Sequence, residues 1–406
     1  MSLAPSTKRA AAAVREATWR ERPCPACFGD AVVDISTQVC DAATRDGAFR
    51  FVKRDSICGE CGLLFAHAVP DDGFLNDYYA AGYLHLKADR AGHLGFDSEW
   101  RLAQLRQSVP TGARVVEFGA GDGAFVEALN GAGWRASGVD LVRKEASDGV
   151  ERRAVESAEM RGADAVVSYY VLEHVADPRR FLAACKAALK PGGTLVIEVP
   201  DVDRFPDEAL HHEHLTYFAP ATLRSLVEAV GFGTIRHHER ASRYFGHSLV
   251  ATLEDTARDR PVAPLPQGIR AAAVDKARRL AAQAAEAGQA RRRSAERLVA
   301  KIVREHGDPA AFDLVVWGAN LMATEIGLAA AAAGVERRTL VDRSESKIGD
   351  VHEGYATATQ RPDFAGDARR PRAIVICSQA WRESIRAELA AMGPQNARVY
   401  AAFDES

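Results

Sequence analysis

The chain has 406 residues, of which 47% are hydrophobic and 26% are charged, and its formal net charge is −3. This composition is typical of a globular protein, and the length predicts roughly two to four domains. The near-zero charge gives no electrostatic reason to expect nucleic acid or an anionic membrane as partner, and no apolar run approaches the roughly 20 residues that span a bilayer.

The first 22 residues are rich in alanine and arginine. They lack the apolar core and the cleavage pattern of a secretory signal peptide. We therefore expect residues 1–22 to be a tail and the protein to be cytoplasmic. The sequence favours a small-molecule substrate over nucleic acid or membrane, and it leaves the oligomeric state open.

Two pairs of cysteines with C-x-x-C spacing follow, Cys24 with Cys27 and Cys58 with Cys61. In a reducing compartment such pairs indicate metal rather than disulfides, and glycine and proline at the turns allow two tight knuckles. Four thiolates fit a closed, structural zinc site, which would supply folding energy. Neither pair opens a helix after a strand, which argues against redox catalysis. We predict a zinc-ribbon-like domain over residues 23–85.

Three further cysteines stand alone in the sequence. The simplest interpretation is that each is a small core residue, because free cysteine behaves as a small apolar side chain. They are Cys40, Cys185 and Cys377.

A glycine-rich turn lies between a predicted strand at residues 113–118 and a predicted helix at 124–130. Gly119, Gly121 and Gly123 would let the backbone approach a ligand, and the N–H groups at the helix start would hold a carboxylate. A second strand ends at Asp140, an acidic residue placed to accept hydrogen bonds from two ribose hydroxyls. The glycine pattern alone is weak evidence, and the following elements strengthen it.

Those elements are a strand at 164–170, the Leu-Glu-His-Val segment at 172–175, a helix at 178–189, a Lys-Pro-Gly-Gly turn at 190–193 and a strand at 194–199. Residues 108–253 together resemble class I S-adenosylmethionine (SAM)-dependent methyltransferases. The alternative, an NAD-binding Rossmann domain, gives no role to the Lys-Pro-Gly-Gly turn or to the segment at 172–175. The resemblance implies an α/β fold with a seven-stranded, mainly parallel sheet and one reversed strand.

The resemblance also implies a set of cofactor-binding residues. The three glycines would line the methionine part of SAM, Asp140 would hold the ribose, and residues 156–159 would lie near the adenine. Glu117 and Tyr170, each at the end of a predicted strand, complete the set.

Other segments resemble the sugar C-methyltransferases, which methylate nucleotide-linked keto-deoxysugars. They are residues 58–83, the Leu-His-His-Glu-His-Leu-Thr-Tyr-Phe segment at 210–218, residues 243–249, where His247 replaces a glycine, and the α/β segment that closes the chain after a helical linker. The resemblance implies that His214 is the base that removes a proton next to the ketone. Glu213 would orient His214 or bind sugar hydroxyls.

One position departs from that family. His211 stands where the family carries a tyrosine. We interpret it either as an alternative hydrogen-bond donor to the enolate oxygen or as a sign of a different substrate. Tyr78, Tyr79 and Tyr83 are weaker site candidates. Two other interpretations of residues 211–214 are a solvent-facing loop with a helix cap and a second metal site, although adjacent residues rarely converge on one metal. We expect His174 to pack or cap near the cofactor rather than to do chemistry.

The C-terminal third begins with a proline-rich break at residues 261–266, and residues 269–306 predict one or two helices. Arg291–Arg293 is a charge run, which indicates a solvated face or a phosphate contact. The strand–Gly318–helix pattern that follows predicts a second Rossmann-like α/β domain. The resemblance implies that this domain closes the substrate cleft; NAD binding and a purely structural or dimer-forming role are the alternatives.

These patterns predict a tail (1–22), a zinc-binding domain (23–85), a SAM-binding domain (86–258), a helical linker (259–308) and a C-terminal α/β domain (309–406). The leading functional hypothesis is C-methylation of a nucleotide-linked keto-deoxysugar with SAM as methyl donor. O- or N-methylation of another polar metabolite or glycan is the alternative enzyme. A zinc module that binds a partner while the second domain senses SAM is the alternative without catalysis.

Overall fold

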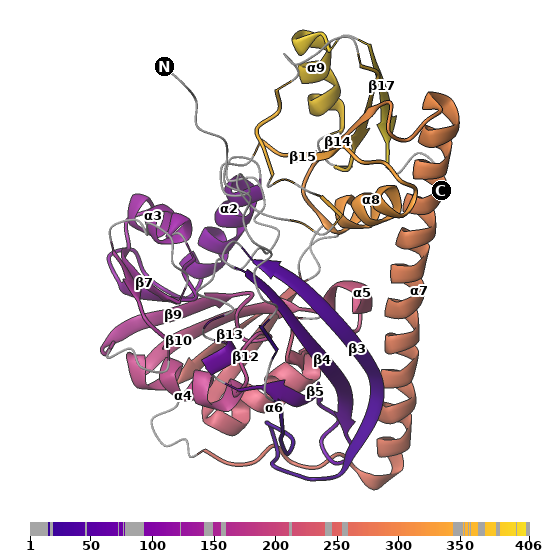
Figure 1. Cartoon of the computed structure of the whole chain (residues 1–406). Coiled ribbons are helices and arrows are strands. Elements are labelled where there is room, and N and C mark those ends of the chain that lie inside the picture. Colours follow the sequence, from indigo (N-terminus) through magenta and orange to yellow (C-terminus); the bar gives the residue numbers. More distant parts are fainter. Residues whose placement is uncertain are drawn as a thin grey trace.

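In the residues that it describes, the computed structural model has three β-sheets with their helices (Figure 1). It describes residues 15–16, 19–44, 47–71, 73–75, 77, 93–121, 123–141, 149–155, 160–210, 213–239, 246–253, 259–343, 352, 354–355, 357, 359–363, 370–378, 382–394 and 396–402.

The first sheet has six strands and follows the N-terminal cysteine segment. Its strands are β1 (Arg15–Glu16), β2 (Trp19–Glu21), β3 (Val32–Thr44), β4 (Gly47–Cys58), β5 (Leu64–Pro70) and β11 (Thr216–Tyr217). β3 and β4 form one long antiparallel hairpin. The first cysteine knuckle lies between β2 and β3, and the second joins β4 to β5. The last strand comes from a segment far along the chain, beyond the predicted boundary at residue 85, and it pairs with β5.

The second sheet has seven strands in the order β12-β13-β10-β9-β6-β7-β8. They are β6 (Arg114–Phe118), β7 (Arg135–Asp140), β8 (Val150–Arg152), β9 (Ala163–Tyr169), β10 (Leu189–Pro200), β12 (Phe232–Glu239) and β13 (Gly246–Leu253). β13 runs antiparallel to both neighbours, and the other neighbouring pairs are parallel. The predicted α/β sheet with one reversed strand is therefore confirmed.

Helices cover both faces of the seven-stranded sheet. They are α2 (His93–Arg106), α3 (Ala124–Gly131), α4 (Pro178–Ala188) and α6 (Pro220–Val230), with the short α5 (Pro206–Ala209) beyond the sheet. Alternate residues of β6 serve the two faces, as strand geometry requires: Val115 packs with Phe125 of α3, whereas Val116 packs with Phe181 of α4. Cys185 lies fully buried on α4, and the side chain of Cys40 lies outside the described residues.

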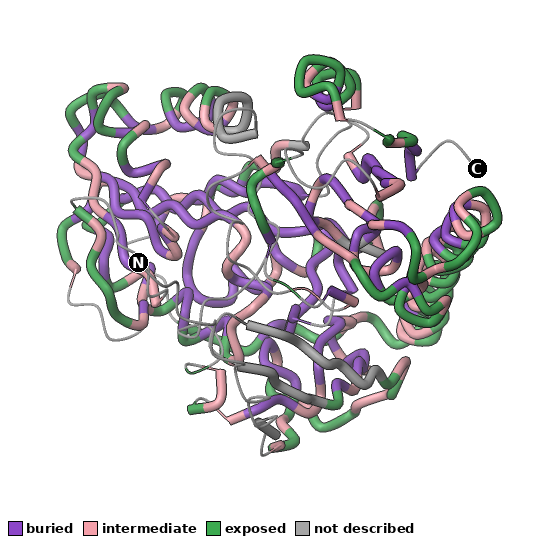
Figure 2. Tube along the Cα trace, turned by 45° about the horizontal axis from the view of Figure 1, so that its top comes forward, coloured by how far each residue is buried: buried purple, intermediate pink, exposed green. Residues whose placement is uncertain are grey.

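The C-terminal sheet has four parallel strands in the order β15-β14-β16-β17. They are β14 (Asp313–Trp317), β15 (Arg338–Val341), β16 (Arg372–Ile376) and β17 (Ala397–Ala401), accompanied by α8 (Leu321–Ala332) and α9 (Arg382–Met392). This arrangement confirms the second Rossmann-like unit. Cys377 is buried there. The strands of the three sheets carry much of the buried chain (Figure 2).

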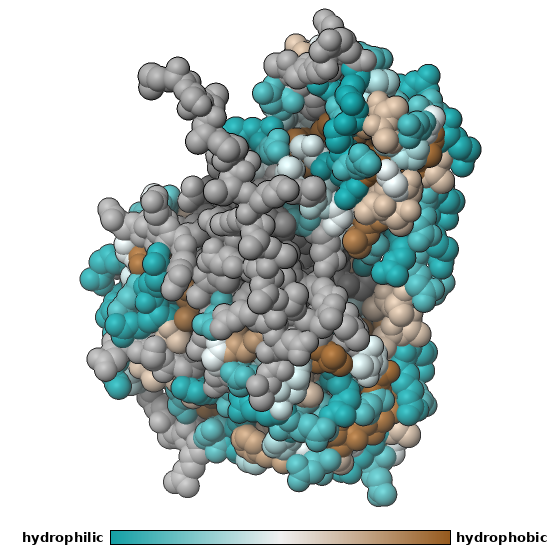
Figure 3. Space-filling view, viewed as in Figure 1, coloured by the Kyte–Doolittle hydropathy of each residue, from teal (hydrophilic) through white to brown (hydrophobic). Residues whose placement is uncertain are grey.

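A single helix, α7 (Gln267–His306), connects the part of the chain with the seven-stranded sheet to the C-terminal sheet. Its first half packs Ala277 and Leu280 into a cluster with Tyr217, and its second half packs Leu298 and Ile302 against the C-terminal sheet. The rest of its surface is largely exposed and hydrophilic (Figure 3). Among the helices that the structure describes, none combines the length and apolar character that crossing a membrane requires.

Candidate functional site

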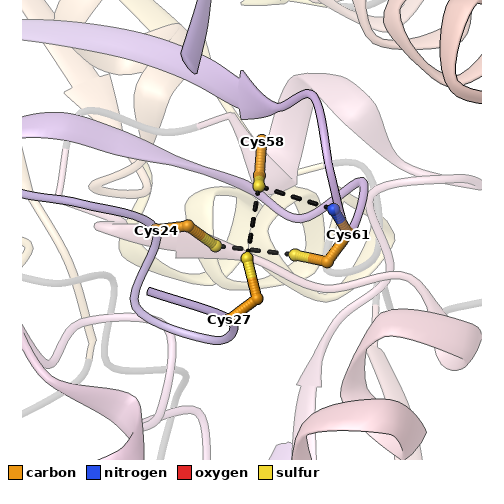
Figure 4. Close-up of side chains that lie close together, drawn as sticks. All are labelled: Cys24, Cys27, Cys58 and Cys61. Atoms are coloured by element: carbon orange, nitrogen blue, oxygen red, sulfur yellow. Dashed lines mark hydrogen bonds between the residues drawn. The ribbon is translucent and has the colours of Figure 1, made fainter. Parts of the chain in front are cut away.

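The four cysteines of the two knuckles point toward one another (Figure 4). The Sγ atoms of Cys24 and Cys61 are 3.5 Å apart, as are those of Cys27 and Cys58. All four Sγ atoms lie within 4.8 Å of one another, and none of these cysteines forms a disulfide. Zn–S bonds of about 2.3 Å in a tetrahedron place neighbouring sulfurs ~3.8 Å apart, so the donor set fits zinc.

The crowding of the thiols couples their protonation. Hydrogen bonds from Cys24 and Cys61 lower the pKa of Cys58 to about 2. The hydrogen bond to Cys58 raises the pKa of Cys24 to about 12. Hydrogen bonds with Cys24 and Cys58 raise the pKa of Cys61. A divalent cation bound by the four sulfurs would stabilise several thiolates together.

The glycine turn after β6 has the backbone that its sequence predicts. Gly119, Gly121 and Gly123 have φ values of 82°, 56° and 84°, a region that favours glycine. A Cβ atom on Gly119 would lie 2.1 Å from the side chain of Val171, so this position has no room for another residue. The N–H of Gly121 donates to Oδ2 of Asp140 at 2.7 Å, which joins the turn to the end of β7. The structure therefore brings four of the predicted cofactor residues together.

Glu117 and Tyr170 lie at the same edge of the sheet, because β6 and β9 are parallel neighbours. Glu117 is buried near the end of β6. Tyr170 follows β9 with a left-handed φ of 57°, and its N–H donates to the carbonyl of Glu198 at 2.8 Å. The buried carboxylate of Glu198 pairs with Arg101 at 3.1 Å. Residues 156–159, predicted near the adenine, lie outside the described residues.

His214 and Glu213 are 5% and 7% exposed, so the interpretation of these two residues as a solvent-facing loop is wrong. Nδ1 of His214 is 2.6 Å from the carbonyl oxygen of Ala209. A carbonyl oxygen only accepts hydrogen bonds, so Nδ1 carries the proton. The predicted site residue His211, its neighbour His212, and Tyr78, Tyr79 and Tyr83 all lie outside the described residues.

His174 and Glu173, in the loop after β9, lie beside His214. The rings of His174 and His214 are 4.7 Å apart between centroids and meet edge to face. Nδ1 of His174 is 3.2 Å from the carbonyl of Glu213, and its Nε2 is 3.8 Å from Oε1 of Glu173. Burial, with a smaller contribution from the nearby Glu198, raises the pKa of Glu173 to about 8. Sequence reasoning assigned His174 a packing or capping role near the cofactor.

A buried polar network lies on the other side of the His214 segment. The Lys53 ammonium donates to the Tyr217 hydroxyl at 2.6 Å and lies 3.4 Å from the Asp55 carboxylate, to which the hydroxyl donates. Lys53 also donates to the carbonyl of His214 at 3.4 Å. Sequence reasoning missed this network, although Lys53 and Asp55 share a face of β4 with the apolar Ile57, which is an unusual place for charges.

Backbone hydrogen bonds fix the same segment from two sides. The N–H of Leu215 donates to the carbonyl of Glu173 at 2.6 Å, and its carbonyl accepts from Ala66 of β5 at 2.9 Å. Thr216 then pairs with Phe65 in the six-stranded sheet. The sheet that carries the cysteine knuckles therefore holds the predicted base.

Comparison with known proteins places this site in context. Residues 97–237 match the family of methyltransferase domains. The C-methyltransferase NovU of Streptomyces niveus is 28% identical over 231 residues, which are 51% of this chain and 52% of NovU. A ubiquinone biosynthesis O-methyltransferase of Xanthomonas campestris is 39% identical over 101 residues, which are 21% of this chain and 42% of that protein.

Among solved structures, a SAM-dependent methyltransferase of Archaeoglobus fulgidus is similar with 18% identity and a TM-score of 0.31, over 45% of this chain and 100% of that one. The chain spans about half the length of the curated relatives it matches.

Proposed function

Because the chain carries a class I SAM-dependent methyltransferase domain over residues 97–237, we propose that it methylates the carbon next to the ketone of a nucleotide-linked keto-deoxysugar. The observation that carries the proposal is the buried His214, whose Nδ1–H is bonded to a backbone carbonyl, so that Nε2 has the basic lone pair. The sugar-methyltransferase resemblance of residues 210–218 supports the substrate class, as does similarity to a C-methyltransferase.

The cofactor would lie along the carboxyl edge of the seven-stranded sheet. Gly119, Gly121 and Gly123 would line its methionine part, Asp140 would accept hydrogen bonds from the ribose hydroxyls, and Glu117 and Tyr170 would bound the site. The absence of space for a side chain at Gly119 and the position of Asp140 beside the turn support this assignment. When bound, SAM supplies an electrophilic methyl group.

His214 performs the proton transfer in this proposal. A carbon next to a ketone becomes nucleophilic only when it loses a proton, and the neutral Nε2 of His214 accepts that proton. The electron pair of the broken C–H bond moves onto the ketone oxygen, where a hydrogen-bond donor stabilises it. His211 is our candidate for that donor, and Glu213 for the group that orients His214 or binds a sugar hydroxyl.

The cysteine site has a structural role in the proposal. Cys24, Cys27, Cys58 and Cys61 would bind one zinc ion and leave no position open for substrate. The ion would stabilise the sheet that pairs with β11 and so hold His214 in place. We propose that residues 309–406 close over the nucleotide part of the substrate, by the same family resemblance.

O-methylation is the second candidate, because O-methyltransferases of ubiquinone biosynthesis are 39% identical over 101 residues. In that case His214 would take the proton of a hydroxyl group.

Proton exchange without SAM distinguishes the two candidates. The protein is incubated in heavy water with nucleotide-linked 4-keto-6-deoxy sugars, and exchange of the proton next to the ketone is followed by NMR. C-methylation predicts exchange in the wild type, loss of exchange in His214→Ala and unchanged SAM affinity in that variant. His237→Ala, outside the site, is the control. Absence of exchange from a protein that binds SAM would contradict C-methylation and favour the O- or N-methyl acceptors.

A further inference from the structure

Three side chains with metal-ligating atoms meet in the interior beside β11. One ligand atom from each of Glu173, His174 and His214 lies within 4.8 Å of the others. The side chain of Glu173 is 2% exposed and that of His174 is 11% exposed, and the whole of His214 is 5% exposed. The two elements that supply them, the loop after β9 and the segment before β11, are joined by the hydrogen bond between Leu215 and Glu173.

The tautomers of both histidines are fixed by the backbone. Nδ1 of His214 donates to the carbonyl of Ala209, and Nδ1 of His174 donates to the carbonyl of Glu213. Each neutral ring therefore has its lone pair on Nε2. Metal-binding histidines usually show this arrangement, in which the nitrogen away from the metal donates to a carbonyl or carboxylate and sets the orientation of the ring.

In its ionised form Glu173 would provide the negative charge of the group. In the described part of the chain, neither of its carboxylate oxygens has a hydrogen-bond partner. An unsatisfied buried carboxylate is costly, and Glu198 adds a second buried carboxylate nearby, already paired with Arg101. A cation bound by Glu173 would offset this cost.

From these contacts we propose that Glu173, His174 and His214 bind one divalent transition-metal cation, separate from the four-cysteine site. Two imidazole nitrogens and one carboxylate suit Zn²⁺, Fe²⁺, Co²⁺ or Ni²⁺, whereas Mg²⁺ and Ca²⁺ prefer oxygen ligands. Three protein ligands leave coordination positions open for water or a substrate oxygen. The second metal site considered from residues 211–214 thus takes only His214 from that segment and draws its other ligands from the loop after β9.

A cation at this site goes beyond the proposed function, and it restricts the role of His214 as a base to the metal-free protein. A metal-bound Nε2 has no lone pair for a proton, so His214 is not a base while the cation is bound. The open positions would then let the cation polarise a ketone or hydroxyl oxygen of the substrate.

Metal content tests the site without reference to activity. The full chain is loaded with Zn²⁺, freed of excess metal and analysed for metal per chain. Glu173→Gln and His174→Ala are predicted to hold one equivalent of Zn²⁺ less than the wild type. Their affinity for the metal at this site should fall more than about 100-fold, because mutating even the hydrogen-bond partners of metal ligands typically costs 10–100-fold. His237→Ala, which removes a histidine of β12, should match the wild type. Equal metal content in all four proteins would overturn the proposal.

A second measurement covers variants that fail to fold. Wild-type protein with its cysteine site filled by Zn²⁺ is titrated with Co²⁺, and the visible absorption is recorded. Binding at the proposed site gives Co²⁺ bands without sulfur-to-metal charge transfer, because its ligands are nitrogen and oxygen. Absence of bound Co²⁺ would contradict the proposed metal site. The proposed function is tested independently by the proton-exchange experiment.

Discussion

Asp140 is the residue whose removal should most directly weaken binding of the cofactor. Its carboxylate already accepts a hydrogen bond from Gly121, and we propose that it also receives the ribose hydroxyls. Asp140→Ala removes the hydrogen bonds to the ribose. A single hydrogen bond to a charged group contributes about 1.5–3 kcal/mol, so the Kd for SAM should rise by at least about 10- to 100-fold. Isothermal titration calorimetry measures the change.

Glu151→Gln is the matched control for this prediction. Glu151 is an acidic residue of the neighbouring strand β8, half exposed and paired with Arg153. Its SAM affinity should equal that of the wild type. An Asp140→Ala variant that binds SAM as tightly as the wild type would remove Asp140 from the cofactor site.

Lys53 is a buried ammonium whose removal should be costly. Lys53→Met would leave the Asp55 carboxylate buried without its cation, which typically lowers the free energy of unfolding by about 3–5 kcal/mol. Adding Asp55→Asn removes the unpaired charge and should recover much of the loss. Denaturant unfolding of the wild type, both single variants and the double variant gives the coupling between the two residues. A single variant as stable as the wild type would mean that the pair contributes little.

Individual residues differ in how far the sequence could predict them. The four cysteines have a recognisable spacing, and the turn glycines directly follow a strand. The local sequence was therefore sufficient to predict that the members of each group lie together. His174 and Lys53 have no such signal. Their roles depend on which distant side chain lies opposite, His214 in one case and Tyr217 in the other, and only the tertiary structure supplies that information.

At the level of elements, the short strand β11 links the cysteine knuckles to the predicted base. Cys58→Ser should abolish binding of the zinc ion that we propose for the cysteine site, lower the thermal midpoint and abolish methyl transfer, because the sheet that contains β11 loses its proposed cross-link. The SAM affinity should change only a few-fold, since the glycine turn belongs to the other sheet. Metal analysis, thermal unfolding and calorimetry measure the three effects.

Cys377→Ala provides the comparison for that variant, because Cys377 is buried in the C-terminal sheet away from the knuckles. Its metal content and methyl transfer should be unchanged. Full activity in zinc-free Cys58→Ser would show that β11 holds His214 without the ion.

The elements themselves were largely predictable, and their pairing was only partly so. Apolar, β-branched runs marked the strands of the seven-stranded sheet. The turn predicted at 190–193 coincides with an irregularity within β10, where the pairing with β9 shifts between Leu189 and Thr194. The six-stranded sheet was harder. Two residues, Thr216 and Tyr217, carry too little pattern to predict a strand, and their partner β5 lies in another part of the sequence.

At the scale of the whole molecule, α7 is the connection on which the arrangement of the sheets depends. A helix of 40 residues spans about 60 Å, and its two halves pack against different sheets. Gly288 lies between the two packed regions, with nothing within 4 Å of an added Cβ. Gly288→Pro should break the helix there at a cost of about 3 kcal/mol, and X-ray scattering should show a changed radius of gyration.

Gly288→Ala tests the same position without a break. It should leave the scattering unchanged and stabilise the helix by about 0.5–1 kcal/mol, because alanine loses less backbone entropy than glycine. Identical scattering from Gly288→Pro and the wild type would show that contacts other than α7 hold the sheets in place.

The pairing of β5 with β11 also has a consequence for synthesis on the ribosome. Phe65 and its partner Thr216 are separated by almost the whole methyltransferase domain. At a synthesis rate of about 5–20 residues per second, β11 leaves the exit tunnel on the order of 10–30 s after β5. During that interval the nascent chain exposes an unpaired strand edge, so early metal binding by the cysteines would protect the chain at the stage when association with neighbouring chains is easiest.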